Sequence, residues 1–168
     1  SAFNQFFNKN EKDYFLLFSQ TGKTPSSSSK EKFYTYLQKM GYEKMADKKQ
    51  DKRVKYVYEN VHNAFLSKYE AKTLFSDIFV NGDYNCVSAT ALYCMAFDFF
   101  KIPYVIKEKP NHVYPVAYPE SQQVIVETTN PMVGSFAFND QFKVSYIENL
   151  KKQKLISNQE EKTKSNND

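Results

Sequence analysis

Tryptophan is absent from the 168 residues, and histidine, cysteine and glycine are scarce, with two, two and four copies. Four glycines leave little room for a glycine-rich phosphate loop, and no GxGxxG pattern occurs. Two histidines far apart in the sequence and two cysteines on one predicted helix do not make a zinc site. No acidic loop of the kind that binds calcium is present either. We therefore expect neither a cofactor nor a metal ion.

Arginine is also nearly missing, since Arg53 is the only arginine among the 23 basic residues. With 19 acidic residues, the net charge is +4. Proteins that read nucleic acids depend on arginine forks, so we expect no nucleic-acid partner and interpret the lysines as a solvated surface. No apolar run approaches the roughly 20 residues of a membrane span, and none is expected. The compartment stays open: cytoplasmic, or secreted with a signal peptide removed.

The chain is rich in aromatic residues, with 15 phenylalanines and 13 tyrosines, and is long enough for one domain with a sizeable core. We expect a single domain over residues 1–155, made of an N-terminal helical arm (1–45) and a core (46–150). The polar residues 156–168 are interpreted as a tail or as a linker to a possible further C-terminal domain.

Helices are predicted in the first half. The serines that end the loop at 21–29 can cap a helix that runs to Met40, with Gly41 as its stop. From residue 47 to residue 69, apolar side chains recur at helical spacing and predict a long amphipathic helix; they are Val54, Val57, Tyr58, Val61, Phe65 and Tyr69. The aromatic clusters in residues 1–23 indicate a short helix or arm that packs on the domain.

A turn over residues 81–85 ends in Asn85, a good N-cap, and a helix is expected to follow from about Cys86 to Phe100. This helix has no polar stripe, so it is expected to be buried on most sides. Three strands are predicted after it, at 102–109, 112–118 and 123–129, and residues 142–147 could form a fourth. The fold class is therefore α+β.

Cys86 and Cys94 lie about 12 Å apart along that helix, too far for a disulfide. Cys94 is interpreted as a small hydrophobic residue of the core. Cys86 occupies the first turn, where the unpaired N–H groups and the helix dipole favour a thiolate. The alternative for Cys86 is a buried thiol without a function, and a base is needed to decide between them.

His112 opens a predicted strand, and Glu127 lies near the end of the next one. A four-residue loop at 119–122 pairs Tyr118 with Gln123, and this register places His112 and Glu127 on one face, roughly 5–8 Å apart at Cβ. The carboxylate could then orient the imidazole, which could take the thiol proton of Cys86. An exposed glutamate and a surface histidine are the alternative.

Several motifs in order resemble the transglutaminase-like branch of the papain-like fold: a helix of small residues opened by Cys86, the strand start Ile102-Pro103, His112-Val113-Tyr114, and an acid before Thr and Pro (127–131). The resemblance covers about residues 75–131. It implies a Cys-His-acid triad of Cys86, His112 and Glu127, on a central helix packed against an antiparallel sheet. Two departures are Glu127 in place of the usual Asp, and Gly82 four residues before Cys86 instead of two.

The resemblance implies a thiol enzyme that forms a thioester with a peptide or protein substrate, resolved by water or by an amine. The N–H of Cys86 would stabilise the oxyanion. Asn81 or Asn85 could supply a second donor, although an N-cap is the better-supported role for Asn85. The rival is a catalytically silent interaction domain of a larger bacterial protein, because transglutaminase-like domains also precede helical repeats in such proteins.

Overall fold

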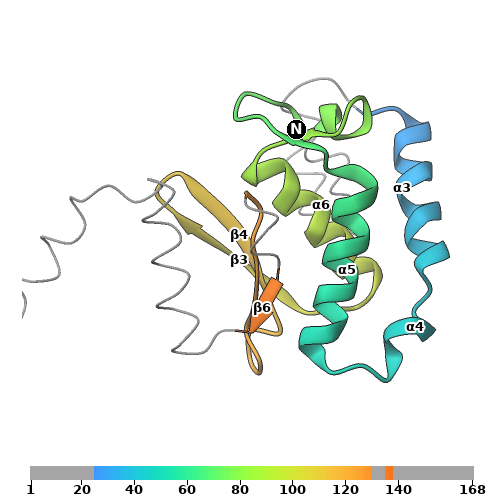
Figure 1. Cartoon of the computed structure of the whole chain (residues 1–168), viewed down its shortest axis with the longest axis vertical. Coiled ribbons are helices and arrows are strands. Elements are labelled where there is room, and N and C mark those ends of the chain that lie inside the picture. Colours follow the sequence, from blue (N-terminus) through green and yellow to red (C-terminus); the bar gives the residue numbers. More distant parts are fainter. Residues whose placement is uncertain (1–24, 130–134, 138–168) are drawn as a thin grey trace, which may run out of the picture. The chain divides into compact units, whose positions relative to one another are not determined.

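The structure is a computed structural model that describes residues 25–129 and 135–137. Helices dominate the first part, and a sheet follows the last helix (Figure 1), so the architecture is α+β. The helices are α3 (Ser27–Met40), α4 (Glu43–Ala46), the 3-10 helix η1 (Phe75–Phe79), α5 (Gln50–Phe65) and α6 (Cys86–Phe99). The strands are β1 (Lys68–Tyr69), β2 (Asp83–Tyr84), β3 (Tyr104–Lys109), β4 (His112–Ala117), β5 (Val124–Val126) and β6 (Ser135–Ala137).

Helix α3 has the ends that its sequence predicts. Ser26 is the N-cap, and its side chain accepts a hydrogen bond from the N–H of Ser29. Gly41 ends the helix at a φ of 73°, a left-handed conformation that suits glycine. Phe33 on α3 packs edge-on against Phe65 of α5, with 5.3 Å between the ring centroids, so α3 and α5 lie side by side (Figure 1).

Helix α5 buries the predicted apolar stripe from Val54 to Phe65, but the prediction that the helix extends to residue 69 is wrong. The backbone becomes extended at Leu66, and the N–H groups of Ser67 and Lys68 donate to the carbonyl of Gly82, at 2.8 and 3.3 Å. Strand pairing thus replaces the helical hydrogen bonds, and Tyr69 lies on β1.

Helix α6 is the centre of the core. It begins at Cys86, as predicted, and all residues from Ser88 to Phe97 are buried. It contacts α5 as well as β4, and the hydroxyl of Thr90 donates to the Val113 carbonyl at 3.1 Å. This position explains why the helix has no polar stripe.

The larger sheet has the strand order β3-β4-β5-β6, and β3 and β5 both pair antiparallel with β4. Val116 pairs with Ile125 and Ala117 with Val124, which is the register expected from a four-residue loop. A separate two-stranded sheet joins β1 and β2 in parallel.

The chain divides into a unit of residues 1–136 and a unit of residues 137–168. Three predicted segments lie outside the described residues: the aromatic part (1–23) of the N-terminal arm (1–45), the fourth strand (142–147) and the polar tail (156–168). The predicted domain limits of 1–155 therefore remain a prediction. Across residues 25–129 and 135–137, no helix combines the length and the hydrophobicity that a membrane crossing needs.

The burial of α6 predicts that substitutions of its buried and exposed residues differ strongly in their effect on the stability of the protein. Leu92 is completely buried, and Leu92→Ala should lower the free energy of unfolding by about 2–5 kcal/mol, because a cavity is added to the lost transfer energy. Val87 on the same helix is 55% exposed, and Val87→Ala should change the value by less than about 0.5 kcal/mol. Urea unfolding measures both, and equal effects would contradict the central place of α6.

Candidate active site

Cys86 is the first residue of α6, directly after the N-cap Asn85. The side chain of Asn85 accepts a hydrogen bond from the N–H of Ser88, and the hydroxyl of Ser88 accepts one from the N–H of Asn85, both at 2.9 Å. This capping box fixes the helix start and confirms the N-cap predicted for Asn85. The Cys86 thiol is half-buried at this helix end.

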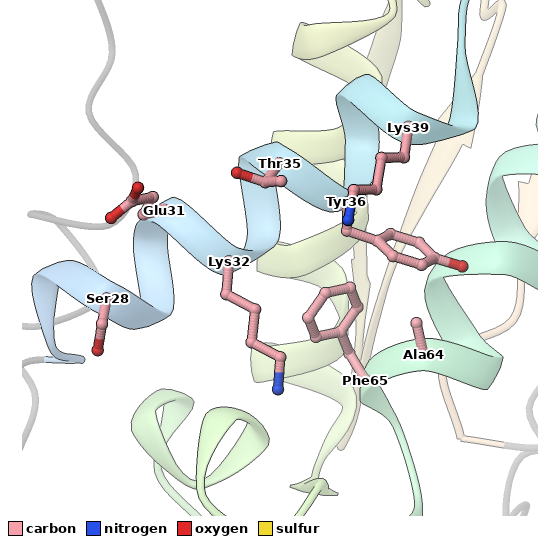
Figure 2. Close-up of a pocket in the computed structure, with 8 residues that line it drawn as sticks. All are labelled: Ser28, Glu31, Lys32, Thr35, Tyr36, Lys39, Ala64 and Phe65. Carbon is pink, nitrogen blue, oxygen red and sulfur yellow. The ribbon is translucent and has the colours of Figure 1, made fainter.

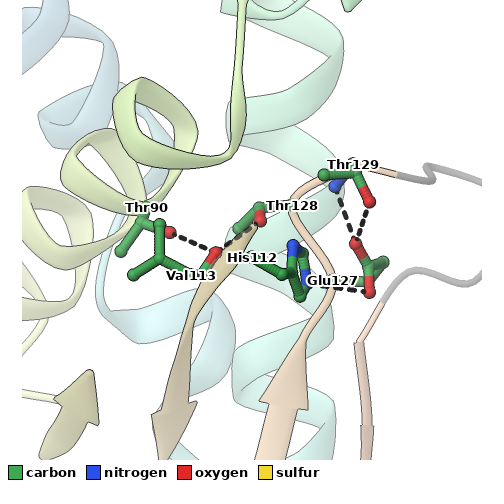
Figure 3. Close-up of polar contacts among 6 residues, drawn as sticks. All are labelled: Thr90, His112, Val113, Glu127, Thr128 and Thr129. Carbon is green, nitrogen blue, oxygen red and sulfur yellow. Dashed lines mark hydrogen bonds and ion pairs between the residues drawn. The ribbon is translucent and has the colours of Figure 1, made fainter. Parts of the chain in front are cut away.

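His112 begins β4, where it pairs with Lys109 of β3. Its ring stacks on the ring of Tyr114, with 5.3 Å between centroids and 25° between planes, and 15% of its side chain is exposed. The next residue, Val113, accepts hydrogen bonds from the hydroxyls of Thr90 on α6 and of Thr128, at 3.1 and 2.9 Å (Figure 3). The start of β4 is therefore fastened both to α6 and to the segment that carries Glu127.

Glu127 follows the last residue of β5, and its side chain is 1% exposed. Oε1 accepts hydrogen bonds from the N–H and the hydroxyl of Thr129, at 2.7 and 2.6 Å. Oε2 lies 3.6 Å from Nε2 of His112, an ion-pair distance longer than a hydrogen bond (Figure 3). Within the described residues Nε2 has no hydrogen-bond partner, and the ion pair is its contact with the carboxylate.

The three ionisable groups shift one another's pKa values toward their charged forms. A hydrogen bond with His112 lowers the pKa of Cys86 against the effect of burial, and the N–H groups of Val113 and Val87 lower it further. Burial alone would lower the pKa of His112, but Cys86 and Glu127 raise it to about 9. Burial alone would raise the pKa of Glu127, but His112 and Thr129 hold it at about 2.

These shifts favour a thiolate beside an imidazolium that also faces a carboxylate. Because Nε2 is directed to Glu127, Nδ1 is the ring nitrogen left for the thiol of Cys86. The structure thus brings together the three residues that the sequence singled out, in the order thiol, imidazole, carboxylate.

Cys94 has a different environment, eight residues further along α6. It is 1% exposed, not bonded to Cys86, and burial raises its pKa to about 12. Its thiol is a core group, as predicted.

The two asparagines considered as oxyanion donors already use their side-chain amides. The Nδ2 of Asn81 donates to Asp83 at 2.8 Å, and the Nδ2 of Asn85 donates to the carbonyls of Ala71 and Thr73 at 3.3 and 3.1 Å. Asn85 thus uses both hydrogens of its amide group, and Asn81 uses one of its two. The sequence pattern placed Tyr69 in the apolar stripe of a helix and not near Cys86, whereas the structure places it on β1, beside the strand that leads into Cys86.

A surface hollow of about 530 Å³ lies elsewhere, between α3 and α5 (Figure 2). Its lining residues are Ser28, Glu31, Lys32, Thr35, Tyr36, Lys39, Ala64 and Phe65, and none belongs to the cluster around Cys86. In the part of the chain that the structure describes, no three His, Cys, Asp or Glu side chains are grouped as a metal ion would require.

Comparisons of the chain with protein-family models, with curated proteins and with solved structures give no match.

The pKa shifts predict that Cys86 alkylates with iodoacetamide at an apparent pKa clearly below about 8.5, whereas Cys94 stays unreactive until unfolding. In His112→Ala the imidazolium is lost, so the apparent pKa of Cys86 should rise. The reaction should slow much more at pH 6 than at pH 9, where the thiolate forms unaided. A variant whose pH profile overlays that of the wild type would remove His112 from the site.

The low pKa of Glu127 predicts a pH-dependent contribution to stability. Because its pKa is about 2 instead of 4.5, the stabilisation is present above pH 4.5 and is lost as the pH falls toward 2. Thr129→Val removes a hydrogen bond to the carboxylate and should cost about 1.5–3 kcal/mol at pH 6. This cost should shrink as the pH approaches 2.

Thr128→Val is the matched control, because its hydroxyl donates to the neutral carbonyl of Val113. It should cost about 0.5–1.5 kcal/mol at every pH. Urea unfolding between pH 2 and pH 6 compares the two variants. Parallel curves would show that Thr129 does not hold the charge of Glu127.

Proposed function

We propose that this protein is a cysteine acyl-transfer enzyme in which Cys86 is the nucleophile, His112 the general base and acid, and Glu127 the group that orients the imidazole. The observation that carries the proposal is the position of His112, whose ring interacts with the Cys86 thiol and faces the buried carboxylate of Glu127. A nucleophile, a base and an orienting acid in this order are the signature of a catalytic triad.

In the acylation step, the Cys86 thiolate attacks the carbonyl carbon of an amide or ester, and a carbon–sulfur bond forms. The negative charge moves to the carbonyl oxygen of a tetrahedral intermediate. When this intermediate collapses, the imidazolium of His112 gives its proton to the leaving amine or alcohol, and the bond to the leaving group breaks. A thioester remains on Cys86, and His112 is neutral.

Deacylation reverses the proton transfer. The neutral imidazole takes a proton from water or from an acceptor amine, which attacks the thioester carbonyl, and the carbon–sulfur bond breaks. The products are an acid or a new amide, and the thiolate and imidazolium are restored. Glu127 stays ionised throughout, because its pKa is held at about 2, and it stabilises each imidazolium that forms.

The arrangement supports the resemblance to the transglutaminase-like branch of the papain-like fold. The cysteine opens a central helix, and the histidine begins strand β4, which packs on this helix. The acid follows β5, the antiparallel neighbour of β4. The use of Glu127 where the family usually has Asp fits the local geometry: the residue lies just beyond β5, and the longer side chain folds back onto Thr129. By this resemblance, the substrate is a peptide or protein amide.

An activated ester tests the proposal without knowledge of the natural substrate. With p-nitrophenyl acetate, the protein should release a burst of one equivalent of nitrophenolate as Cys86 is acylated. Cys86→Ala should abolish the burst, and Glu127→Gln should slow it by about 10²–10⁴-fold, because the imidazole loses its orienting charge. Stopped-flow absorbance measures the rates.

Cys94→Ala is the matched control, since it removes the buried thiol on the same helix and should leave the burst intact. A wild type that releases no more nitrophenolate than Cys86→Ala would overturn the proposal. The interaction domain of a larger bacterial protein would then be the better interpretation.

A further inference from the structure

Tyr69 is held beside the strand that leads into Cys86. Strands β1 and β2 run parallel, Tyr69 pairs with Tyr84, and the chain passes from Tyr84 through Asn85 to Cys86. The two tyrosine rings meet edge to face, with 5.8 Å between centroids and 88° between planes. Tyr84 is buried, whereas Tyr69 is 43% exposed, so Tyr69 presents a fixed ring at the protein surface.

The backbone on both sides of Tyr69 is fastened to this strand. Before it, the N–H of Ser67 donates to the carbonyl of Gly82 at 2.8 Å. Gly82 has a φ of 81°, and a Cβ at this position would lie 2.4 Å from Oγ of Ser67, so glycine is required for this approach. After it, the N–H of Glu70 donates to the carbonyl of Tyr84 at 2.8 Å, and Asn85 binds the carbonyls of Ala71 and Thr73. Tyr69 therefore needs little reorganisation to bind a substrate.

The hydroxyl group of Tyr69 is available as a hydrogen-bond donor. Within residues 25–129 and 135–137, no hydrogen bond engages the hydroxyl of Tyr69, whereas those of Thr90 and Thr128 donate to Val113 and that of Thr129 to Glu127. Burial, together with the negative charges of Cys86 and Glu127, raises the pKa of Tyr69. The phenol is thus close enough for both charges to affect its pKa. It stays protonated at a pH at which Cys86 is a thiolate.

An acyl transfer places negative charge on the carbonyl oxygen, and such sites usually stabilise it with two donors. The N–H of Cys86 is one, because the first N–H groups of a helix have no acceptor within it. The amide of Asn85 already makes two hydrogen bonds, and the amide of Asn81 is held by Asp83 through one. We propose that the hydroxyl of Tyr69 is the second donor and binds the carbonyl oxygen of the acyl group that Cys86 attacks. This inference rests on the proposed acyl-transfer function.

Tyr69→Phe tests the proposed hydrogen bond to the oxyanion separately from ring packing, because it keeps the ring contact with Tyr84 and removes only the hydroxyl. Acylation by p-nitrophenyl acetate develops an oxyanion, so the burst rate should fall by about 10²–10³-fold. Alkylation by iodoacetamide displaces iodide at a saturated carbon and develops no oxyanion. The rate of this reaction and its pH profile should therefore stay as in the wild type.

Tyr42→Phe is the matched control, because Tyr42 is similarly exposed, at 52%, and precedes α4. It should change neither reaction. If Tyr69→Phe leaves the burst of an active wild type unchanged, the inference fails while the proposed function stands. If it slows both reactions equally or shifts the alkylation profile, the hydroxyl acts on the thiolate, and the inference fails as well. A wild type without a burst overturns the proposed function, and this inference with it.

Discussion

Glu127 carries a negative charge with only 1% of its surface exposed, and a charge so deeply buried persists only where partners compensate its lost hydration. Here Thr129 provides two hydrogen bonds to one carboxylate oxygen, and the imidazolium of His112 faces the other. The charges on Glu127 and His112 therefore stabilise each other, and a charged His112 in turn favours the thiolate of Cys86.

The charge of Glu127 also acts on several tyrosines. Burial raises the pKa of five tyrosines, and the charge of Glu127 adds to the effect in each: Tyr58, Tyr69, Tyr84, Tyr93 and Tyr114. Neutral aromatic rings hold little water, so electrostatic interactions between the charges they enclose are weakly screened. These tyrosines thus stay neutral around a charged Glu127.

The sequence predicted correctly two features that depend on residues close together in the chain. The turn ending in Asn85 and the apolar run after it predicted that α6 begins at Cys86, because a cap and a helix start depend on a few neighbouring residues. The four-residue loop predicted the register between β4 and β5, and hence the approach of His112 to Glu127. Both predictions used only residues close in sequence or joined by a single tight turn.

The features that the sequence did not predict depend on contacts between distant segments. Tyr69 continues the apolar spacing of α5, but Ser67 and Lys68 pair with Gly82 instead of extending the helix. The apolar spacing of the helix gives no indication that Gly82 is the partner of these residues. The same pairing that ends the helix early brings Tyr69 next to Tyr84, on the strand that leads into Cys86. The early end of the helix and the position of Tyr69 thus have one cause, a contact between segments that are distant in sequence.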